Sequence, residues 1–179
     1  MSPKPVDSMP ERVPPAPVMD PGSLPNEFLK SLKISPAVDE DLTALSQLRS
    51  GSEPWKARGE KPEESLQALT KLRPFSHVAR LQNQTVGYVT VERDGPVPGA
   101  AYLRNILVKA ELGRKGLGMA LLTYAIQVAS DMHRKTLALR VDPSNAPAVG
   151  FYRKAGFTTV ATVVSKKSGK LRLLMSREL

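Results

Sequence analysis

The stretch from Asn105 to Met132 reads NILVKAELGRKGLGMALLTYAIQVASDM and decides the fold. It begins as an apolar strand, passes through a short turn that contains glycines, and continues as a long amphipathic segment. From Leu117 to Met132 apolar residues recur at helical spacing, so one broad face is expected to pack against a sheet. The stretch therefore predicts a strand, a turn and a helix that begins near Gly116.

This turn is suited to binding an anion. The first turn of a helix carries backbone N–H groups without intrahelical partners, and the helix dipole adds partial positive charge there. Gly116 and Gly118 lack the side chains that would keep a phosphate from these donors, while Arg114 and Lys115 supply positive charge. The alternative is a turn whose glycines only relieve crowding, and the stretch alone favours neither interpretation.

Two common phosphate motifs do not fit the turn. A P-loop requires Gly-Lys followed by Ser or Thr, whereas the glycines here lead into Leu117 and Met119. A dinucleotide fingerprint requires a small residue three positions after Gly118, where the sequence has Leu121. We therefore expect neither a triphosphate site nor a dinucleotide site.

The composition narrows the class of protein. A chain of 179 residues suits one domain with its own core. It has no cysteine and two histidines, so we expect neither disulfides nor a metal site. No apolar run approaches the roughly 18 residues of a membrane span, and the first residues lack the apolar block of a secretory signal. A cytoplasmic protein that does not enter membranes is the simplest expectation.

The charge is strongly basic, with a formal net charge of +9 at pH 7. The first 30 residues carry three basic and four acidic side chains, so the remaining chain carries +10. Such a domain could bind a polyanionic ligand, an acidic partner or nucleic acid. Only 5% of the residues are aromatic, and no interleaving of basic and aromatic residues marks a stacking platform, so nucleic acid is the least favoured.

Domain organisation follows from proline content and periodicity. Residues 1–28 are rich in proline and are expected to form an extended leader, and residues 29–179 form the domain. Within the domain we expect strands near 32–35, 77–82, 85–94, 100–108, 137–141, 160–165 and 171–176, and helices near 41–50, 62–73, 116–132 and 145–155. Trp55, in the loop between the first two helices, is expected to pack on the core. This order indicates a mixed α/β domain.

Two motifs together resemble the GNAT superfamily of N-acetyltransferases over roughly residues 32–178. The first is the glycine turn GRKGLG at 113–118, which follows an apolar strand. The second lies about 30 residues later and consists of Asn145, Ala148, Phe151, Tyr152, Gly156 and Phe157. The strand AYLRNILV and the turn are also similar to the branch that acetylates ribosomal-protein alanine N-termini. The resemblance implies a mostly antiparallel, twisted central sheet of about seven strands with about four helices.

The resemblance also implies a site for acetyl-CoA as cosubstrate. It assigns the pyrophosphate to the glycine turn, the pantetheine arm to the preceding strand, and further support to the later helix. The implied residues are Ile106, Leu107, Val108, Gly113, Arg114, Lys115, Gly116, Leu117, Gly118, Met119, Asn145 and Phe151. Gly113 departs from the family pattern, which has Gln or Arg at that position.

Tyr152 is the candidate general acid. Its phenol has an ordinary pKa of about 10 against about 8.5 for a thiol, so it can protonate a leaving thiolate and still hold its own proton at neutral pH. The alternative role is packing beside Phe151 with a hydrogen-bonded hydroxyl. Given the surrounding motif we favour the catalytic role, with backbone donors near Val108 for the oxyanion.

The general base and the acceptor amine stay open. The positions at which family members carry a glutamate base look to be Tyr102 and Arg140 here, which leaves Glu92 as the candidate carboxylate. We favour a base relayed through water, with an acceptor amine of modest pKa. Arg104 and Arg140 hint at an acceptor that carries a carboxylate or phosphate. The acceptor is either a peptide N-terminus or a small amine. The alternative function is a non-catalytic acyl-CoA sensor on the same fold. A homodimer is possible for either function.

Overall fold

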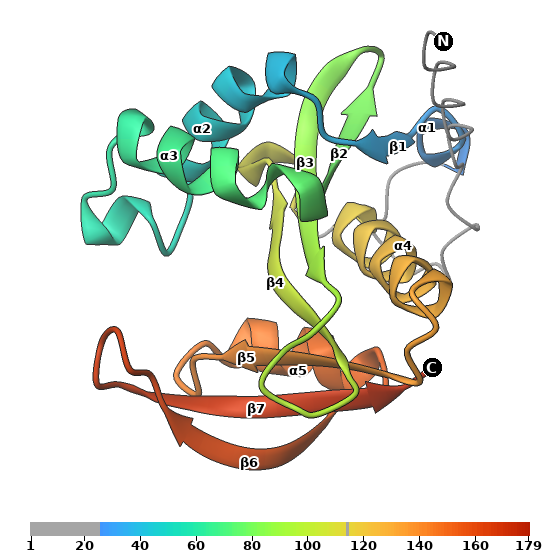
Figure 1. The fold of residues 1–179 in the computed structure, drawn as a ribbon. Helices are drawn as coiled ribbons and strands as arrows, with labels where there is room; N and C mark the ends of the chain where they lie inside the picture. Colours follow the sequence, from blue (N-terminus) through green and yellow to red (C-terminus); the bar gives the residue numbers. More distant parts are fainter. Residues whose placement is uncertain (1–25, 114) are drawn as a thin grey trace, which may run out of the picture.

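The computed structural model describes residues 26–113 and 115–179, so Arg114 and all of the expected leader before Asn26 lie outside the described residues. The helices are α1 Asn26–Lys30, α2 Leu42–Ser50, α3 Pro62–Leu72, α4 Leu117–Asp131 and α5 Ala146–Lys154. The strands are β1 Lys33–Pro36, β2 Ser76–Leu81, β3 Gln84–Glu92, β4 Ala101–Val108, β5 Thr136–Val141, β6 Thr158–Val164 and β7 Leu171–Glu178. Figure 1 shows their arrangement.

One seven-stranded sheet in the order β1-β2-β3-β4-β5-β7-β6 organises the described chain. Its neighbouring strands are antiparallel except for β4 and β5, which run parallel. The expected mixed α/β fold with a mostly antiparallel sheet is therefore confirmed. The structure adds the short helix α1, which the sequence did not predict because five residues beside a proline-rich run show no helical period.

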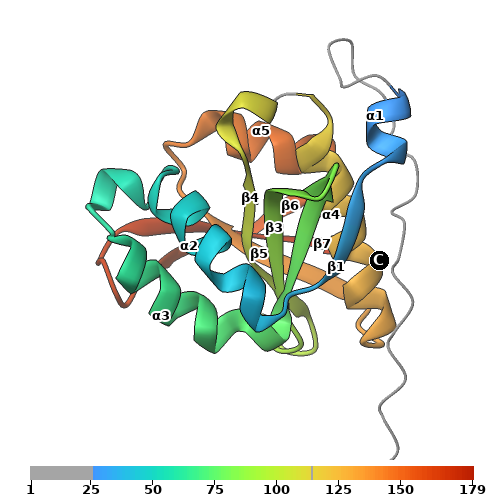
Figure 2. The same ribbon diagram turned by 90° about the horizontal axis from the view of Figure 1, so that it is seen from above.

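Helices cover both faces of the sheet. Figure 2 shows α2 and α3 on one side of the N-terminal strands and α4 on the other. The larger core cluster joins residues of α4 and α5 to the sheet and includes Leu121, Tyr152 and Phe157. The smaller cluster joins α2 and α3 to β2, β3 and β4 and includes Leu45 and Tyr88.

Helix α4 begins where the sequence predicts. Gly116 is its N-cap residue with φ of +86°, a left-handed conformation in which a side chain would be strained. Along the helix, residues at three- and four-residue spacing are buried against β3 and β4, among them Leu117, Leu121 and Ala125. No helix in the described ranges is both long enough and apolar enough to cross a membrane.

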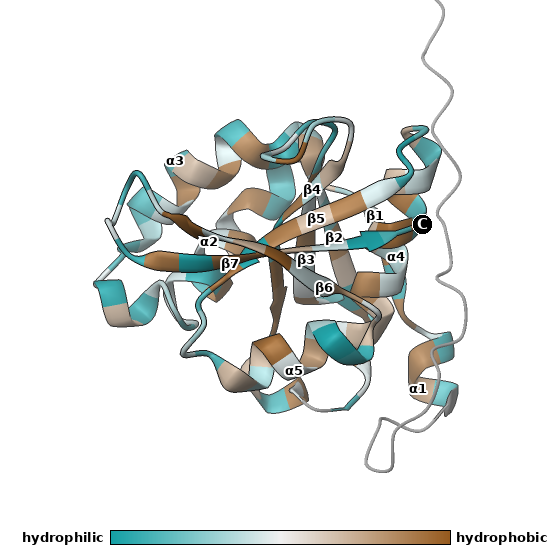
Figure 3. Ribbon diagram, turned by 90° about the horizontal axis from the view of Figure 1, so that it is seen from below, coloured by the Kyte–Doolittle hydropathy of each residue, from teal (hydrophilic) through white to brown (hydrophobic). Residues whose placement is uncertain are grey.

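Local capping explains the bounds of α5. The Asn145 side-chain oxygen accepts a hydrogen bond from the Ala148 backbone N–H at 3.2 Å, which satisfies one donor of the first turn. Gly156 follows the helix with φ of +87°, the conformation that ends many helices. Figure 3 shows both apolar and hydrophilic residues along α5, and the helix buries Val149 and Tyr152.

A partly buried ion pair fastens the loop between α2 and α3. Arg49 Nε donates to Glu60 Oε1 at 2.7 Å, and the Ser65 hydroxyl donates to the same oxygen at 2.6 Å. The Arg49 guanidinium also lies 4.7 Å from the centre of the Trp55 ring. Trp55 is only 9% exposed, which confirms that it packs on the core.

Gly87 on β3 sets how closely β3 and β4 approach each other. A Cβ atom at Gly87 would lie 2.5 Å from the Leu107 carbonyl oxygen and 3.1 Å from Leu121 Cδ1. We expect Gly87→Ala to lower the free energy of unfolding by roughly 1–3 kcal/mol, because the strands or α4 must move. Gly150→Ala in α5 is the control, since its Cβ would meet nothing within 4 Å and should stabilise by roughly 0.5–1 kcal/mol. Equal urea midpoints for both variants would contradict this account.

The cap of α5 gives a second stability test. Asn145→Ala removes the acceptor for the Ala148 N–H and should lower the free energy of unfolding by about 1 kcal/mol. Asn145→Asp keeps a side-chain oxygen at that place and should retain wild-type stability. Thermal denaturation of the three proteins measures the difference, and a destabilised Asp variant would show that the cap is not the main contribution of Asn145.

Candidate active site

Strands β4 and β5 separate after a short parallel pairing. Only Ala101, Tyr102 and Leu103 of β4 pair with β5, and their partners are Leu137, Ala138 and Leu139. Strand β4 continues through Val108, with pairing to β3 alone. Residues 104–108 therefore have a backbone edge without a strand partner on the β5 side, and polar groups at such an edge are free to pair with an extended ligand.

Two N–H groups point to this open edge. The Lys109 N–H donates to the Val86 carbonyl oxygen on β3 at 2.8 Å. Because successive N–H groups of an extended strand point to opposite sides, those of Ile106 and Val108 point to the β5 side. Both residues are half-buried with side chains toward the larger core cluster, whereas Leu107 faces α2 and α3.

The glycine turn leads into an uncapped helix N-terminus. No side chain caps α4, and its first intrahelical bond runs from the Ala120 N–H to the Gly116 carbonyl oxygen. The N–H groups of Leu117, Gly118 and Met119 therefore have no intrahelical acceptor, which is the arrangement that favours an anion. Leu117 is fully buried, so it can contribute only its backbone.

The other residues of the turn differ in what they can offer. The Gly113 N–H donates to the Ala110 carbonyl oxygen at 3.1 Å, so this donor is already used inside the turn. Lys115 is exposed, and Arg114 lies outside the described residues. A Cβ at Gly118 would meet the Phe151 ring at 3.6 Å, which brings the start of α4 next to α5. The predicted residues at the turn and on α5 thus lie together, while Asn145 is exposed at the tip of α5.

Tyr152 is buried in an aromatic cluster on the side of α4 and α5. Its ring centroid lies 5.3 Å from that of Phe151 and 5.8 Å from that of Phe157. Burial, together with the neighbouring Tyr102 phenol, raises the pKa of Tyr152 to about 12. The phenol therefore keeps its proton throughout the neutral range.

Glu92 lies on the opposite face of the sheet from Tyr152. The β3–β4 register shifts between Thr90 and Val91, which leaves Arg104 as an extra residue on β4. Arg104 Nε donates to Glu92 Oε2 at 2.5 Å, and its guanidinium lies 5.4 Å from the Tyr102 ring centroid. The structure thus does not bring the two predicted catalytic side chains together.

Two further buried polar groups lie on the α2 and α3 side of β3 and β4 and were missed from the sequence. The Asn105 Nδ2 has no hydrogen-bond partner among the described residues, and the Tyr88 hydroxyl lies near Arg49, whose charge acts against the rise that burial causes in the pKa of Tyr88. Tyr88 belongs to the cluster under α2 and α3, and alternation along β4 places Asn105 on the face of Leu107. The two-residue period of β3 is the signal that would have placed Tyr88 and Glu92 on one face.

Comparisons with known proteins agree with this geometry. Residues 42–157 match the family model described as Acetyltransferase (GNAT) family. Over 85 residues the chain is 32% identical to a relative from Bacillus subtilis (strain 168) with the provisional name ribosomal protein bS18-alanine N-acetyltransferase. That match covers 42% of this chain and 56% of the relative, so it spans little more than half of the relative's length.

Solved structures share the fold. Ard1 from Thermoplasma volcanium has a TM-score of 0.69 at 18% identity, and the match covers 83% of this chain and 98% of that one. PaiA N-acetyltransferase from Thermoplasma acidophilum, solved in complex with coenzyme A, has a TM-score of 0.63 at 20% identity. That match covers 83% of this chain and 99% of PaiA. The family match spans most of the described chain, including the open edge of β4, the glycine turn and α5, and this protein therefore belongs to the acetyltransferase (GNAT) family.

Proposed function

We propose that this protein is an acetyl-CoA-dependent N-acetyltransferase that moves an acetyl group directly to a primary amine. The observation that carries the proposal is the open edge of β4, which leads from the region of Tyr152 to the uncapped start of α4. A ligand with an extended arm and a diphosphate at its far end is complementary to the N–H groups of the β4 edge followed by those at the start of α4. When bound, acetyl-CoA supplies the carbonyl that the amine attacks and the sulfur that leaves.

The described residues fit this cosubstrate. The N–H groups of Ile106 and Val108 would pair with the amide groups of the pantetheine arm or donate to the oxyanion. The backbone of Gly116, Leu117, Gly118 and Met119, with the charge of Lys115, would hold the pyrophosphate. Leu107, Gly113, Asn145 and Phe151 complete the proposed contacts, and the predicted contact of Arg114 lies outside the described residues.

Tyr152 would act as the general acid. Its pKa of about 12 means that the phenol is protonated at neutral pH. The ordinary pKa of a thiol, about 8.5, lies below that of this phenol, so transfer of the proton to the thiolate is unfavourable by itself. The proton that the amine releases would return through water to the phenolate and complete the transfer. In the balanced reaction the amine nitrogen bonds to the acetyl carbon, the carbon–sulfur bond breaks, and the sulfur takes the proton.

The amine must lose a proton, and the proposed route is through water. Glu92 is the candidate carboxylate, but its Oε2 already accepts a hydrogen bond from Arg104 Nε at 2.5 Å. The positive charge of Arg104 makes this carboxylate a weaker base. The buried Asn105 amide nitrogen, which has no hydrogen-bond partner among the described residues, would order a water molecule on that route. The acceptor amine would then need a modest pKa.

The relative from Bacillus subtilis is named for the alanine N-terminus of a ribosomal protein, which makes a peptide N-terminus one plausible class of acceptor. An α-amine has an ordinary pKa of about 7.7–8.0, in agreement with a weak base. The name of that relative also supports a cytoplasmic location as part of the proposal. Small-molecule amines form the other class.

Removal of the Tyr152 hydroxyl tests the proposed acid. We expect Tyr152→Phe to lower kcat by about 100-fold, because the thiolate then leaves without a proton donor. Thiol release from acetyl-CoA over an amine panel measures this, and Tyr124→Phe, a second buried tyrosine of the larger cluster, is the control. CoA binding in calorimetry without turnover on any amine would replace the transferase with a non-catalytic acyl-CoA sensor.

Glu92→Gln tests the base. With a water-relayed proton, kcat/KM at neutral pH should fall by no more than about 3-fold, since general-base contributions are typically 10²–10⁴. Because this change also weakens the pair with Arg104, Arg104→Gln serves as the matched variant that breaks the pair and keeps the carboxylate. A large loss in Glu92→Gln alone would make Glu92 the general base.

A further inference from the structure

Two arginines flank the point at which β4 and β5 separate. Leu103 and Leu139 form the last residue pair between the strands. Arg104 and Arg140 are the next residues, one on each strand. Both are exposed, and they lie at the mouth of the gap whose edge is proposed to hold the cosubstrate.

Both guanidinium groups belong to the sheet face that looks toward α2 and α3. Tyr102 pairs with Ala138, so their side chains share a face, and alternation places Arg140 on the face of Ala138. The Arg104 guanidinium lies 5.4 Å from the Tyr102 ring centroid on the same face. Burial raises the pKa of Tyr102, and the charges of Arg140 and Arg104 act against this rise, in agreement with their closeness to the phenol.

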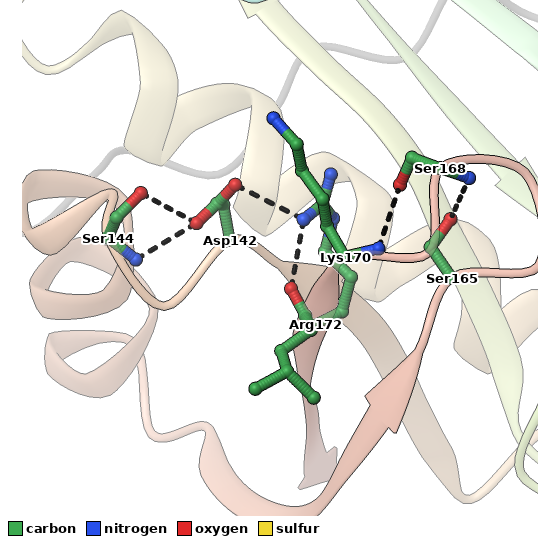
Figure 4. Close-up of polar contacts among 7 residues, drawn as sticks. Asp142, Ser144, Ser165, Ser168, Lys170 and Arg172 are labelled. Atoms are coloured by element: carbon green, nitrogen blue, oxygen red, sulfur yellow. Dashed lines mark hydrogen bonds and ion pairs between the residues drawn. The ribbon is translucent and has the colours of Figure 1, made fainter.

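A third arginine lies on the same face of the neighbouring strand. Arg140 pairs with Leu174 on β7, and Arg172 is two residues before Leu174. Arg172 Nη1 donates a hydrogen bond to Asp142 Oδ2 at 3.1 Å. The other oxygen of Asp142 accepts hydrogen bonds from the Ser144 N–H and hydroxyl, as Figure 4 shows. These bonds, with the charges of Arg172 and Lys170, lower the pKa of Asp142, so the carboxylate is charged at neutral pH.

The charges around the gap therefore do not balance. Arg104 has Glu92 as its partner, and Arg172 has Asp142. Arg140 makes no ion pair within 4.0 Å with any residue in the part of the chain that the structure describes. Among the three arginines on this face, Arg104 and Arg172 each form an ion pair with a carboxylate, whereas Arg140, which lies between them, forms none with any described residue.

The same face carries two buried polar groups. The Asn105 Nδ2 lies on β4, one strand from β5 and beside the open edge, whereas the Tyr88 hydroxyl belongs to β3, two strands from β5, and lies near Arg49. The α4 side of the gap holds Tyr152 and the start of α4 in the same core cluster. An acceptor that approaches from the α2 and α3 side would place its amine near the edge and the rest of the molecule beside Arg140.

We propose that the acceptor is a small amine that carries an anionic group, a carboxylate or a phosphonate, and that Arg140 pairs with this group. This inference rests on the proposed function. An arginine–carboxylate pair is charge-assisted and directional, so it selects strongly between an acid and its neutral amide. The uncompensated charge at Arg140 also repels polyamines, which would have to bring a second cation to this face.

Matched acceptor pairs test the inference in the full chain. The pairs are glycine and glycinamide, β-alanine and β-alaninamide, and 2-aminoethylphosphonate and ethanolamine, with spermidine as the polycation. Initial rates at saturating acetyl-CoA give kcat and KM, expressed per unprotonated amine because the anionic group raises the amine pKa. We expect a preference for the anionic member of at least one pair of roughly 10- to 100-fold. A preference in the glycine or β-alanine pair identifies a carboxylate acceptor, and a preference in the 2-aminoethylphosphonate pair identifies a phosphonate acceptor.

The variants then locate the preference. Arg140→Gln should abolish it through a higher KM for the anionic acceptor, with kcat changed little and the neutral acceptor unaffected, and Arg140→Lys should retain part of it. Lys135→Gln removes one charge about 16 Å away at the other end of β5 and should leave the preference intact.

Other outcomes overturn the inference. Turnover of amides, spermidine or neutral peptide N-termini as fast as of the anionic amines would show that Arg140 does not select the acceptor. An equal loss for both members of a pair in Arg140→Gln would assign Arg140 a structural role. CoA binding without turnover of any acceptor would instead remove the proposed function on which the inference rests.

Discussion

The structure depends on the limited pairing of β4 with β5. In a parallel pair every further residue would add a backbone hydrogen bond, yet these strands pair through three residues and then diverge. The extra residue at Arg104 bends β4 where the pairing ends, and the lack of a side chain at Gly87 lets the rest of β4 lie close against β3. The donors of the open edge are therefore held in place by one neighbouring strand and remain accessible on the other side.

The helices give the two sides of this gap different properties. On one side α4 and α5 meet where Gly118 lies against Phe151, and they enclose Tyr152 in an aromatic cluster. On the other side α2 and α3 cover β3 and the end of β4, while β5 and β7 present the charged side chains of Arg140 and Arg172. The proposed transferase would thus hold its proton donor in an apolar environment and receive the acceptor from a polar one.

Features determined by nearby residues were predictable from the sequence. The start of α4 at Gly116, the Asn145 cap and the stop at Gly156 follow from glycine and asparagine chemistry within one helical turn. The separation of β4 and β5 was not predictable, since it depends on a bulge and on pairing between residues that lie 36 positions apart, such as Ala101 and Leu137. For the same reason the pairing of Glu92 with Arg104, and the buried groups of Tyr88 and Asn105, emerged only from the assembled sheet.

Tyr102 connects the two sides and separates their charges. A cation close to a phenol lowers its pKa, and burial away from cations raises it and keeps the phenol protonated in the neutral range. Arg140 and Arg104 act on Tyr102, whereas burial and Tyr102 itself raise the pKa of Tyr152 to about 12. The arginines thus lie one aromatic ring away from the proposed acid. This arrangement allows a cationic acceptor site and a protonated phenol to serve the same gap, because the ring that separates them is half-buried and carries no charge.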